Sequence, residues 1–217
     1  GPSASVDNRV AAMSGTTGKL IKDSGVLITS LPRVDAAQSF SQAEKVLMAA
    51  NIGMGYVQIG GRVSFTNSAA VAWTDLSEYS ELQLEFSAIG NAACNLGLQA
   101  SVDNGASWLS GANDYAYKTI FSNGTAIVTT EVATVNRFPV VGLSLANIMD
   151  ASAAISRFNK IQTKQILSDA AFFDGSNSKY SISNTSGYFN AGVANALRLI
   201  STTGTWTGNA TLWGRKG

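Results

Sequence analysis

Residues 80–86 read Ser-Glu-Leu-Gln-Leu-Glu-Phe, and this stretch decides the fold class of the chain. Leu82, Leu84 and Phe86 occupy every second position, and the positions between them carry glutamine or glutamate. Successive side chains of a strand point to opposite faces, so this spacing puts the apolar groups on one face and the polar groups on the other. The stretch therefore predicts a half-buried strand of an antiparallel sheet.

The same spacing recurs from residue 56 onward. We predict further strands at residues 56–65, 95–102, 115–121, 126–132, 140–148, 155–167, 180–189, 196–201 and 210–215. Turn residues, among them Asn-Gly and Asp-Asn-Gly, separate these runs. About ten short strands of this kind are typical of an antiparallel β-sandwich with jelly-roll-like connections.

Residues 151–171 admit a second interpretation. Ile155, Phe158 and Ile161 partly fit the spacing of a helix. We predict two strands in this segment, and a helix stays the alternative. No repeat of about 20 to 50 residues recurs along the chain, so we do not expect a solenoid or a propeller.

Residues 4–54 differ from the rest of the chain. Their apolar side chains are spaced neither by two nor by about 3.6 residues, so the block has no obvious core of its own. Its one clear helix signal is the capping box at residues 41–44, which predicts a helix too short to be stable alone in water. We therefore expect a mainly β homotrimer, in which residues 4–54 form a stalk and helical neck and residues 56–217 form a β-sandwich head. Residues 1–3, Gly-Pro-Ser, are expected to be a protease-cleavage remnant.

Composition and charge exclude several classes of function. The 217 residues include 15 Lys and Arg and 14 Asp and Glu, a net charge of +1, so no strong field attracts nucleic acid. Histidine is absent and Cys94 is the one cysteine, which excludes His-containing catalytic triads, His-ligated metals and zinc clusters of cysteines. No run of about 18 apolar residues predicts a membrane span. We expect no cofactor, no metal and no membrane insertion.

The acidic residues give no catalytic pair in the sequence. Glu81 and Glu85 share a strand face, but their Cα atoms would lie about 13 Å apart, beyond the separation used in glycoside hydrolysis. Asp103 belongs to residues 101–108, Ser-Val-Asp-Asn-Gly-Ala-Ser-Trp, which fit the Asp-box pattern of a hairpin turn. The later aspartates lie near Gly, Asn or Ser, where turn and cap roles are common: Asp114, Asp150, Asp169 and Asp174. We therefore expect that the chain is not an enzyme.

The aromatic side chains divide into two groups by their neighbours in the sequence. The rings in apolar runs are expected in the core: Trp73, Phe86, Phe138, Phe172 and Trp213. The rings beside polar or glycine-rich turns are candidate ligand-binding residues, because rings at sandwich loops stack on the apolar face of a sugar. This second group consists of Trp108, Tyr115, Tyr117, Tyr180, Tyr188 and Trp206.

A resemblance to a known family begins at residues 37–53, which read AQSFSQAEKVLMAANIG. This stretch resembles the linker found in the tail fibres of tailed bacteriophages, and residues 8–11 and 15–26 resemble another stretch common in phage tail and fibre proteins. In such linkers, a short helix from each of three chains packs about the fibre axis. The resemblance implies a homotrimer with contacts at Phe40, Ala43, Val46, Leu47 and Ala50.

Four stretches of the head are similar to the distal modules of phage fibre proteins: residues 101–108, 115–117, 196–198 and 208–214. The resemblance implies that the chain attaches the virion to a glycan or protein of the bacterial surface by multivalent, non-catalytic binding. Other phage tail proteins are its implied partners, and the tail fibre is its implied location, after synthesis in the host cytoplasm. Two other functions stay open, a glycan-degrading tailspike domain and a purely architectural virion decoration protein.

Overall fold

The computed structural model describes residues 9–14, 20–27, 55–91, 96–122, 126–140, 148–174, 179–201 and 203–217. The chain divides into two compact units, Gly1–Lys45 and Val46–Gly217, and each is described by itself. The predicted helix that begins at residue 41 lies outside the described residues. The same holds for the predicted trimer contacts Phe40, Ala43, Val46, Leu47 and Ala50.

The first unit contains a two-stranded antiparallel sheet. Strand β1 (Arg9–Ser14) pairs with β2 (Leu20–Leu27), and the register shifts between Arg9 and Ala11. We predicted no strand here, because the apolar residues of this stretch follow no regular period. Two paired strands are marginally stable alone in water, so this pair needs further contacts to hold its fold.

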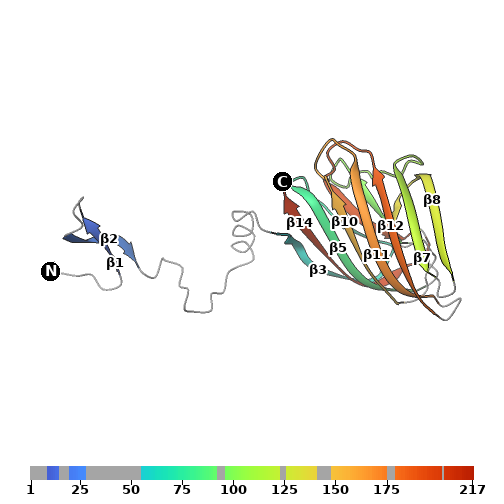
Figure 1. The fold of residues 1–217 in the computed structure, drawn as a ribbon, viewed down its shortest axis with the longest axis horizontal. Helices are drawn as coiled ribbons and strands as arrows, with labels where there is room; N and C mark the ends of the chain where they lie inside the picture. The colour runs from blue at the N-terminus through green and yellow to red at the C-terminus, as the bar shows by residue number, and fades with distance from the viewer. Residues whose placement is uncertain are drawn as a thin grey trace. The chain divides into compact units, whose positions relative to one another are not determined.

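The second unit is built on an eight-stranded antiparallel sheet, whose strands are labelled in Figure 1. From edge to edge the strands are β3 (Val57–Ser68), β14 (Trp206–Lys216), β5 (Tyr79–Gly90), β10 (Ile148–Ser156), β11 (Lys164–Asp174), β12 (Lys179–Phe189), β7 (Tyr115–Ser122) and β8 (Ile127–Val135). Neighbouring strands all run antiparallel. The last strand of the chain, β14, is inserted between β3 and β5.

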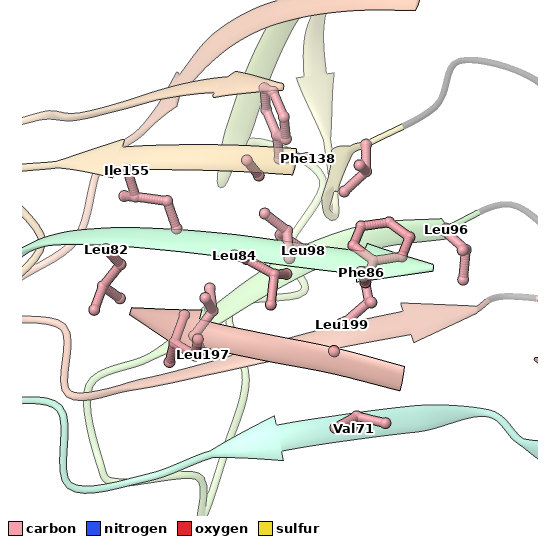
Figure 2. Close-up of a cluster of buried hydrophobic side chains, with 14 of the residues drawn as sticks. Val71, Leu82, Leu84, Phe86, Leu96, Leu98, Phe138, Ile155, Leu197 and Leu199 are labelled. Carbon is pink, nitrogen blue, oxygen red and sulfur yellow. The ribbon is translucent and has the colours of Figure 1, made fainter. Parts of the chain in front are cut away.

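A four-stranded antiparallel sheet packs on the inner face of the eight-stranded sheet. Its strands, in order, are β4 (Ala70–Trp73), β13 (Ala196–Ser201), β6 (Leu96–Ser101) and β9 (Phe138–Pro139). Figure 2 shows the core between the sheets, where Leu82, Leu84 and Phe86 of β5 lie with Leu98 of β6 and Leu199 of β13. The unit is therefore mainly β, with antiparallel sheets in a sandwich-like arrangement, as the sequence predicted.

Two predictions about particular segments are confirmed. Leu82, Leu84 and Phe86 are buried in β5, and Glu85 between them is exposed. Residues 151–171 contain parts of β10 and β11, which pair antiparallel, so the helix alternative is wrong. Four of the five aromatic rings predicted in the core are buried, namely Trp73, Phe86, Phe138 and Phe172.

The predicted strand at residues 155–167 is wrong in its centre, where residues 157–163 connect β10 to β11. Arg157 has a φ of 61°, and the backbone N–H of Phe158 donates to the carbonyl of Ser80 at 2.8 Å. Phe158 is fully buried although it lies outside the strands, and this apolar side chain made the segment resemble a strand. Of the predicted strand at residues 140–148, the central part lies outside the described residues.

Candidate functional site

The eight-stranded sheet has one face on the core and one face outward. Because side chains alternate along each strand, the residues between the buried ones point outward. The strand register aligns these outward residues in rows across the sheet. From β3 to β12, one row reads Arg62, Thr211, Glu85, Ser152, Asp169 and Asn184. The next row, from β14 to β12, reads Asn209, Ser87, Asp150, Ala171 and Ile182.

These two rows line an open hollow of about 760 Å³. We call it the acidic hollow and define it by Glu85, Asp150, Asp169, Asn184 and Asn209. Three carboxylates line it, and Arg62 is the one positively charged residue in its lining. The hollow therefore carries a net negative charge and a dense set of hydrogen-bonding groups.

Hydrogen bonds fix part of the acidic hollow and leave one carboxylate free. The Nη2 atom of Arg62 donates to Asn209 Oδ1 at 2.5 Å, and Asn184 Nδ2 donates to Asp169 Oδ1. The Asp150 side chain is exposed and makes neither a hydrogen bond nor an ion pair with any described residue. A free carboxylate accepts hydrogen bonds from a ligand without breaking a contact of the protein.

A second hollow of about 380 Å³ adjoins the acidic hollow and shares Asp150 and Ala171 with it. We call it the apolar shelf, after the side chains of Ile148, Phe173 and Tyr180 that line it. Tyr180 is 83% exposed, and its ring meets the Phe173 ring edge-on at a centroid distance of 5.4 Å. A sugar has apolar ring faces and hydrogen-bonding hydroxyls, so an exposed ring beside carboxylates suits it.

A third hollow, of about 530 Å³, includes Tyr188 and Leu167 in its lining. Lys118 Nζ and Glu131 Oε2 form an exposed ion pair at 3.5 Å in the same lining. Tyr180 and Tyr188 occupy the same outward face of β12, and their eight-residue separation corresponds to about 26 Å. This face therefore suits an extended ligand better than a single small molecule.

The structure places Tyr180 and Tyr188, two of the six predicted ligand residues, on this outward face. Two others, Tyr115 and Trp206, are buried, so the prediction that they bind a ligand is wrong. Tyr115 is 1% exposed, its hydroxyl accepts a hydrogen bond from a backbone N–H of β6 at 2.8 Å, and burial raises its pKa. Trp206 is fully buried, and its ring centroid lies 4.2 Å from that of Phe65. A ligand in solvent reaches neither ring, so Tyr115 and Trp206 are core residues.

The other two predicted ligand residues lie outside the acidic hollow. Tyr117 borders the third hollow, but it is on the inward face of β7 and packs against the core. Trp108 lies against the guanidinium of Arg198, whose central carbon is 4.5 Å from the indole ring centroid. Trp213, which we predicted in the core, is half-buried on the outward face of β14. Position along the strand, rather than the polarity of the sequence neighbours, decides which way a ring faces.

The Asp-box turn is confirmed. Asp103 accepts hydrogen bonds from the backbone N–H of Ser107 at 2.8 Å and from Ser101 Oγ at 2.6 Å. Asn104 and Gly105 have φ values of 59° and 90°, as the tight turn requires. The hydrogen bond from Ser101, followed by those from Ser107, lowers the pKa of Asp103 to about 2.

Sequence reasoning missed the carboxylates of the acidic hollow. It assigned Asp150 and Asp169 to turns and rejected Glu85 as the partner of Glu81 on one strand. In the structure Asp150 and Asp169 lie within strands, and Asp150 is diagonal to Glu85 on one neighbouring strand and to Asp169 on the other. Each of three strands carries an acidic residue at an outward position, and this pattern is visible in the sequence. It indicates a cluster of carboxylates only when the three strands are known to be neighbours in the sheet.

Two classes of site are missing from the part of the chain that the structure describes. No three His, Cys, Asp or Glu side chains of this part lie close enough together to hold a metal ion. No helix among the same residues is long and apolar enough to cross a membrane.

The similarity of the chain to known proteins is limited. No family model matches the chain, and no curated protein matches it. Among solved structures, it is similar to sucrose-6-phosphate hydrolase from Lactobacillus gasseri, with 15% sequence identity and a TM-score of 0.31. The match covers 73% of this chain and 28% of that one.

The prediction that the chain is not an enzyme is corrected, because the residues of the described sheet do not exclude an enzyme. The absence of histidine and of a carboxylate pair along one strand was insufficient ground for that prediction, since carboxylates on neighbouring strands also lie close together. A TM-score of 0.31 assigns no activity to this chain. The function is therefore argued from the site.

Proposed function

We propose that the chain is the distal module of a phage tail fibre and attaches the virion to a bacterial surface glycan through the acidic hollow. The observation that carries this proposal is the Asp150 carboxylate, which is exposed and unpartnered among the described residues where the acidic hollow meets the apolar shelf. The resemblance of residues 37–53 to tail-fibre linkers supports the virion context. The alternative receptor is a protein of the outer surface.

A neutral or amino-bearing saccharide suits the chemistry of the acidic hollow. Carboxylates accept hydrogen bonds from hydroxyl and ammonium groups, and each such bond to a charged group contributes about 1.5–3 kcal/mol. Asn184 and Asn209 add both donors and acceptors. The net negative charge repels a sugar that carries a carboxylate or phosphate. Tyr180, at the far side of the apolar shelf, adds a surface for stacking.

The proposed assembly is a homotrimer with a stalk at residues 4–54 and a jelly-roll-like head at residues 56–217. A short neck helix from each chain packs about the fibre axis, and other tail proteins bind the fibre. Three heads on one fibre bind at high effective concentration, so weak individual sites give firm attachment. Support for this arrangement comes from the tail-fibre resemblance and from the irregular apolar pattern of residues 4–54.

Binding of the purified chain to host cells and to a glycan array tests the attachment role. Asp150→Asn and Asp169→Asn keep the side-chain shape and remove its charge, so each should weaken binding by about 10- to 100-fold. Glu131→Gln is the matched control, because Glu131 is an exposed acid of the same sheet outside the acidic hollow. Full binding by both aspartate variants would contradict the proposal. Periodate oxidation of the cells should abolish binding to a glycan, whereas binding that survives it indicates a protein receptor.

Light scattering of the purified chain tests the assembly. A mass of three chains supports the trimeric fibre. A monomer at micromolar concentration contradicts it, and in that case the glycan site would act without avidity.

Glycan hydrolysis is a second candidate function, favoured by the placement of the carboxylates. Asp150 is diagonal to both Glu85 and Asp169, and the Cα atoms of diagonal neighbours across a sheet lie about 7–8 Å apart, so their carboxyl groups can approach this separation. Inverting glycoside hydrolases use two carboxyl groups about 6.5–9.5 Å apart. A rise in reducing ends on incubation with host polysaccharide, lost in Glu85→Gln and Asp150→Asn, would establish hydrolysis. Absence of both binding and cleavage favours the third candidate, virion decoration.

A further inference from the structure

Two arginines flank a glutamine on the outward face of the four-stranded sheet. Arg198 of β13 pairs in register with Gln99 of β6, and Leu98 of β6 pairs with Phe138 of β9. Antiparallel pairing therefore brings Arg137 opposite Gln99 from the other side. Leu98 and Phe138 are fully buried in the core, so Gln99 and Arg137 lie on the opposite face of the sheet, where Gln99 is 4% exposed. We call Arg198, Gln99 and Arg137 the arginine row.

Neutral groups hold the arginine row in place. Arg198 donates through Nε at 2.9 Å and through Nη2 at 2.5 Å to Gln99 Oε1. Gln99 Nε2 in turn donates to the backbone carbonyl of Asn136 at 2.7 Å, and Arg137 Nη1 donates to Asn136 Oδ1 at 3.2 Å. None of these acceptors carries a charge, so the row is positioned without being neutralised.

Neither arginine of the row forms an ion pair with a described residue. Both side chains are half-buried, and Arg137 Nε is buried without a hydrogen-bond partner. Burial lowers the pKa of both guanidinium groups. They belong to segments about 10 Å apart, one on each side of β6. A bound anion compensates the desolvation of each charge.

Trp108 and Gly97 fix the arginine row before a ligand arrives. The Arg198 guanidinium stacks on the indole of Trp108 with 4.5 Å between its central carbon and the ring centroid. A Cβ atom on Gly97 would lie 2.7 Å from Cδ of Arg137, so glycine at this position lets the arginine side chain lie across the strand. Preorganised donors lose less conformational entropy when a ligand binds.

We propose that the arginine row binds an oxyanion, namely the carboxylate or phosphate group of an acidic saccharide. The planar guanidinium presents parallel N–H groups that match two oxygens of either anion. Arg198 Nη1 has no hydrogen-bond partner among the described residues, and the partly exposed Trp108 beside it offers a surface for a sugar ring. The site lies on the opposite sheet from the acidic hollow and does not depend on the proposed attachment function.

Titration of the purified chain, followed by tryptophan fluorescence and calorimetry, tests this site. Tri-galacturonate and glucose 1-phosphate are the carboxylate and phosphate probes, inorganic phosphate is the sugar-free probe, and maltotriose is the neutral control. We expect at least one acidic saccharide to bind, and maltotriose not to displace it. Arg198→Gln and Arg137→Gln should each weaken this binding at least tenfold, and Arg198→Lys, which keeps the charge but loses the planar fork, should weaken it less.

Two variants on the other sheet separate this site from the acidic hollow. Arg62→Gln removes a guanidinium from the acidic hollow, and Asp150→Asn removes its free carboxylate, so both should leave binding of the acidic saccharide unchanged. Their outcome on glycan attachment therefore does not affect this test. Thermal unfolding shows which variants are folded. If Arg198→Gln does not fold, Arg137→Gln and Arg198→Lys still test the site.

Three results would overturn the proposal. The first is no binding of either acidic saccharide at millimolar concentration. The second is binding that is equal in the wild type and in the folded arginine variants, because the row would then make no contact. The third is inorganic phosphate binding as tightly as both acidic saccharides, because the sugar would then contribute nothing.

Discussion

The two outward faces of the sandwich carry opposite charges over the same core. The eight-stranded face gathers three carboxylates beside the apolar shelf, whereas the four-stranded face holds two guanidinium groups beside an indole. The net charge of +1 for the whole chain hides this separation. Overall charge therefore does not predict which ligands a sandwich with two exposed faces accepts.

The faces also differ in apolar exposure. Ile89, Ile148 and Ile182 on the eight-stranded face are 50%, 58% and 58% exposed. On β4 of the four-stranded sheet, the outward positions are the alanines Ala70 and Ala72. Contiguous exposed apolar side chains mark contact surfaces, so the wide sheet suits a large ligand and the narrow sheet a single charged group.

Truncation of a core side chain beneath both faces should have the largest effect on stability. Trp206 is fully buried and packs on Phe65 and Phe86, so Trp206→Ala should lower the free energy of unfolding by about 3–5 kcal/mol. Binding by both faces should fall together, because one fold supports them. Chemical denaturation followed by circular dichroism measures the loss. An unchanged denaturation midpoint would show that this ring does not stabilise the sandwich.

Ligand charge should distinguish the faces next. A cationic glucosamine trimer should bind the eight-stranded face and tri-galacturonate the four-stranded face. Because the screening length falls from about 30 Å at 0.01 M salt to about 3 Å at 1 M, both affinities should drop several-fold over that range. Calorimetry at increasing sodium chloride concentration measures the change. Affinities that do not respond to salt would mean that charge does not separate the faces.

Acid should weaken the turn that carries Trp108. The folded-state pKa of Asp103 is about 2, below its ordinary value of 3.8, so its carboxylate stabilises the fold fully above about pH 4. That stabilisation is lost as the pH falls from there toward 2. Asp103→Asn should therefore be less stable than the wild type at neutral pH, and the two should converge near pH 2. Thermal unfolding across this range measures the difference, and parallel curves would contradict the assignment.

The smallest effect is expected at the edge of the eight-stranded face. Lys118 and Glu131 are 57% and 75% exposed, and exposed ion pairs contribute about 0–1 kcal/mol. Glu131→Gln should therefore change stability by no more than that and leave glycan binding intact, as thermal unfolding and the cell-binding assay would show. A loss of binding as large as that of Asp169→Asn would mean that diffuse charge, rather than the acidic hollow, governs this face.

Much of the strand content could be predicted from the sequence, and the errors have physical causes. The alternation in residues 80–86 was decisive, because one face of β5 is buried and the other exposed. The segment at residues 155–167 was misread, because Phe158 fills the core from a turn. Spacing alone does not distinguish an apolar residue that a turn delivers to the core from one within a strand.

The candidate site was beyond prediction for a different reason. Glu85 and Asp169 are far apart in the sequence and flank Ser152 only because β5, β10 and β11 are neighbours in one register. Tyr115 and Trp206 were placed at the surface because polar residues flank them, yet both point inward. Which face a residue occupies follows from strand pairing, and a single sequence does not specify that pairing.

The shared core also fixes the directions in which the sandwich can hold its ligands. Packed sheets lie about 10 Å apart, and their outer surfaces point away from each other. A short oligosaccharide seated on one side is therefore out of reach of the other. With both sides occupied, one sandwich would link two separate polymer strands, one held on each outer surface.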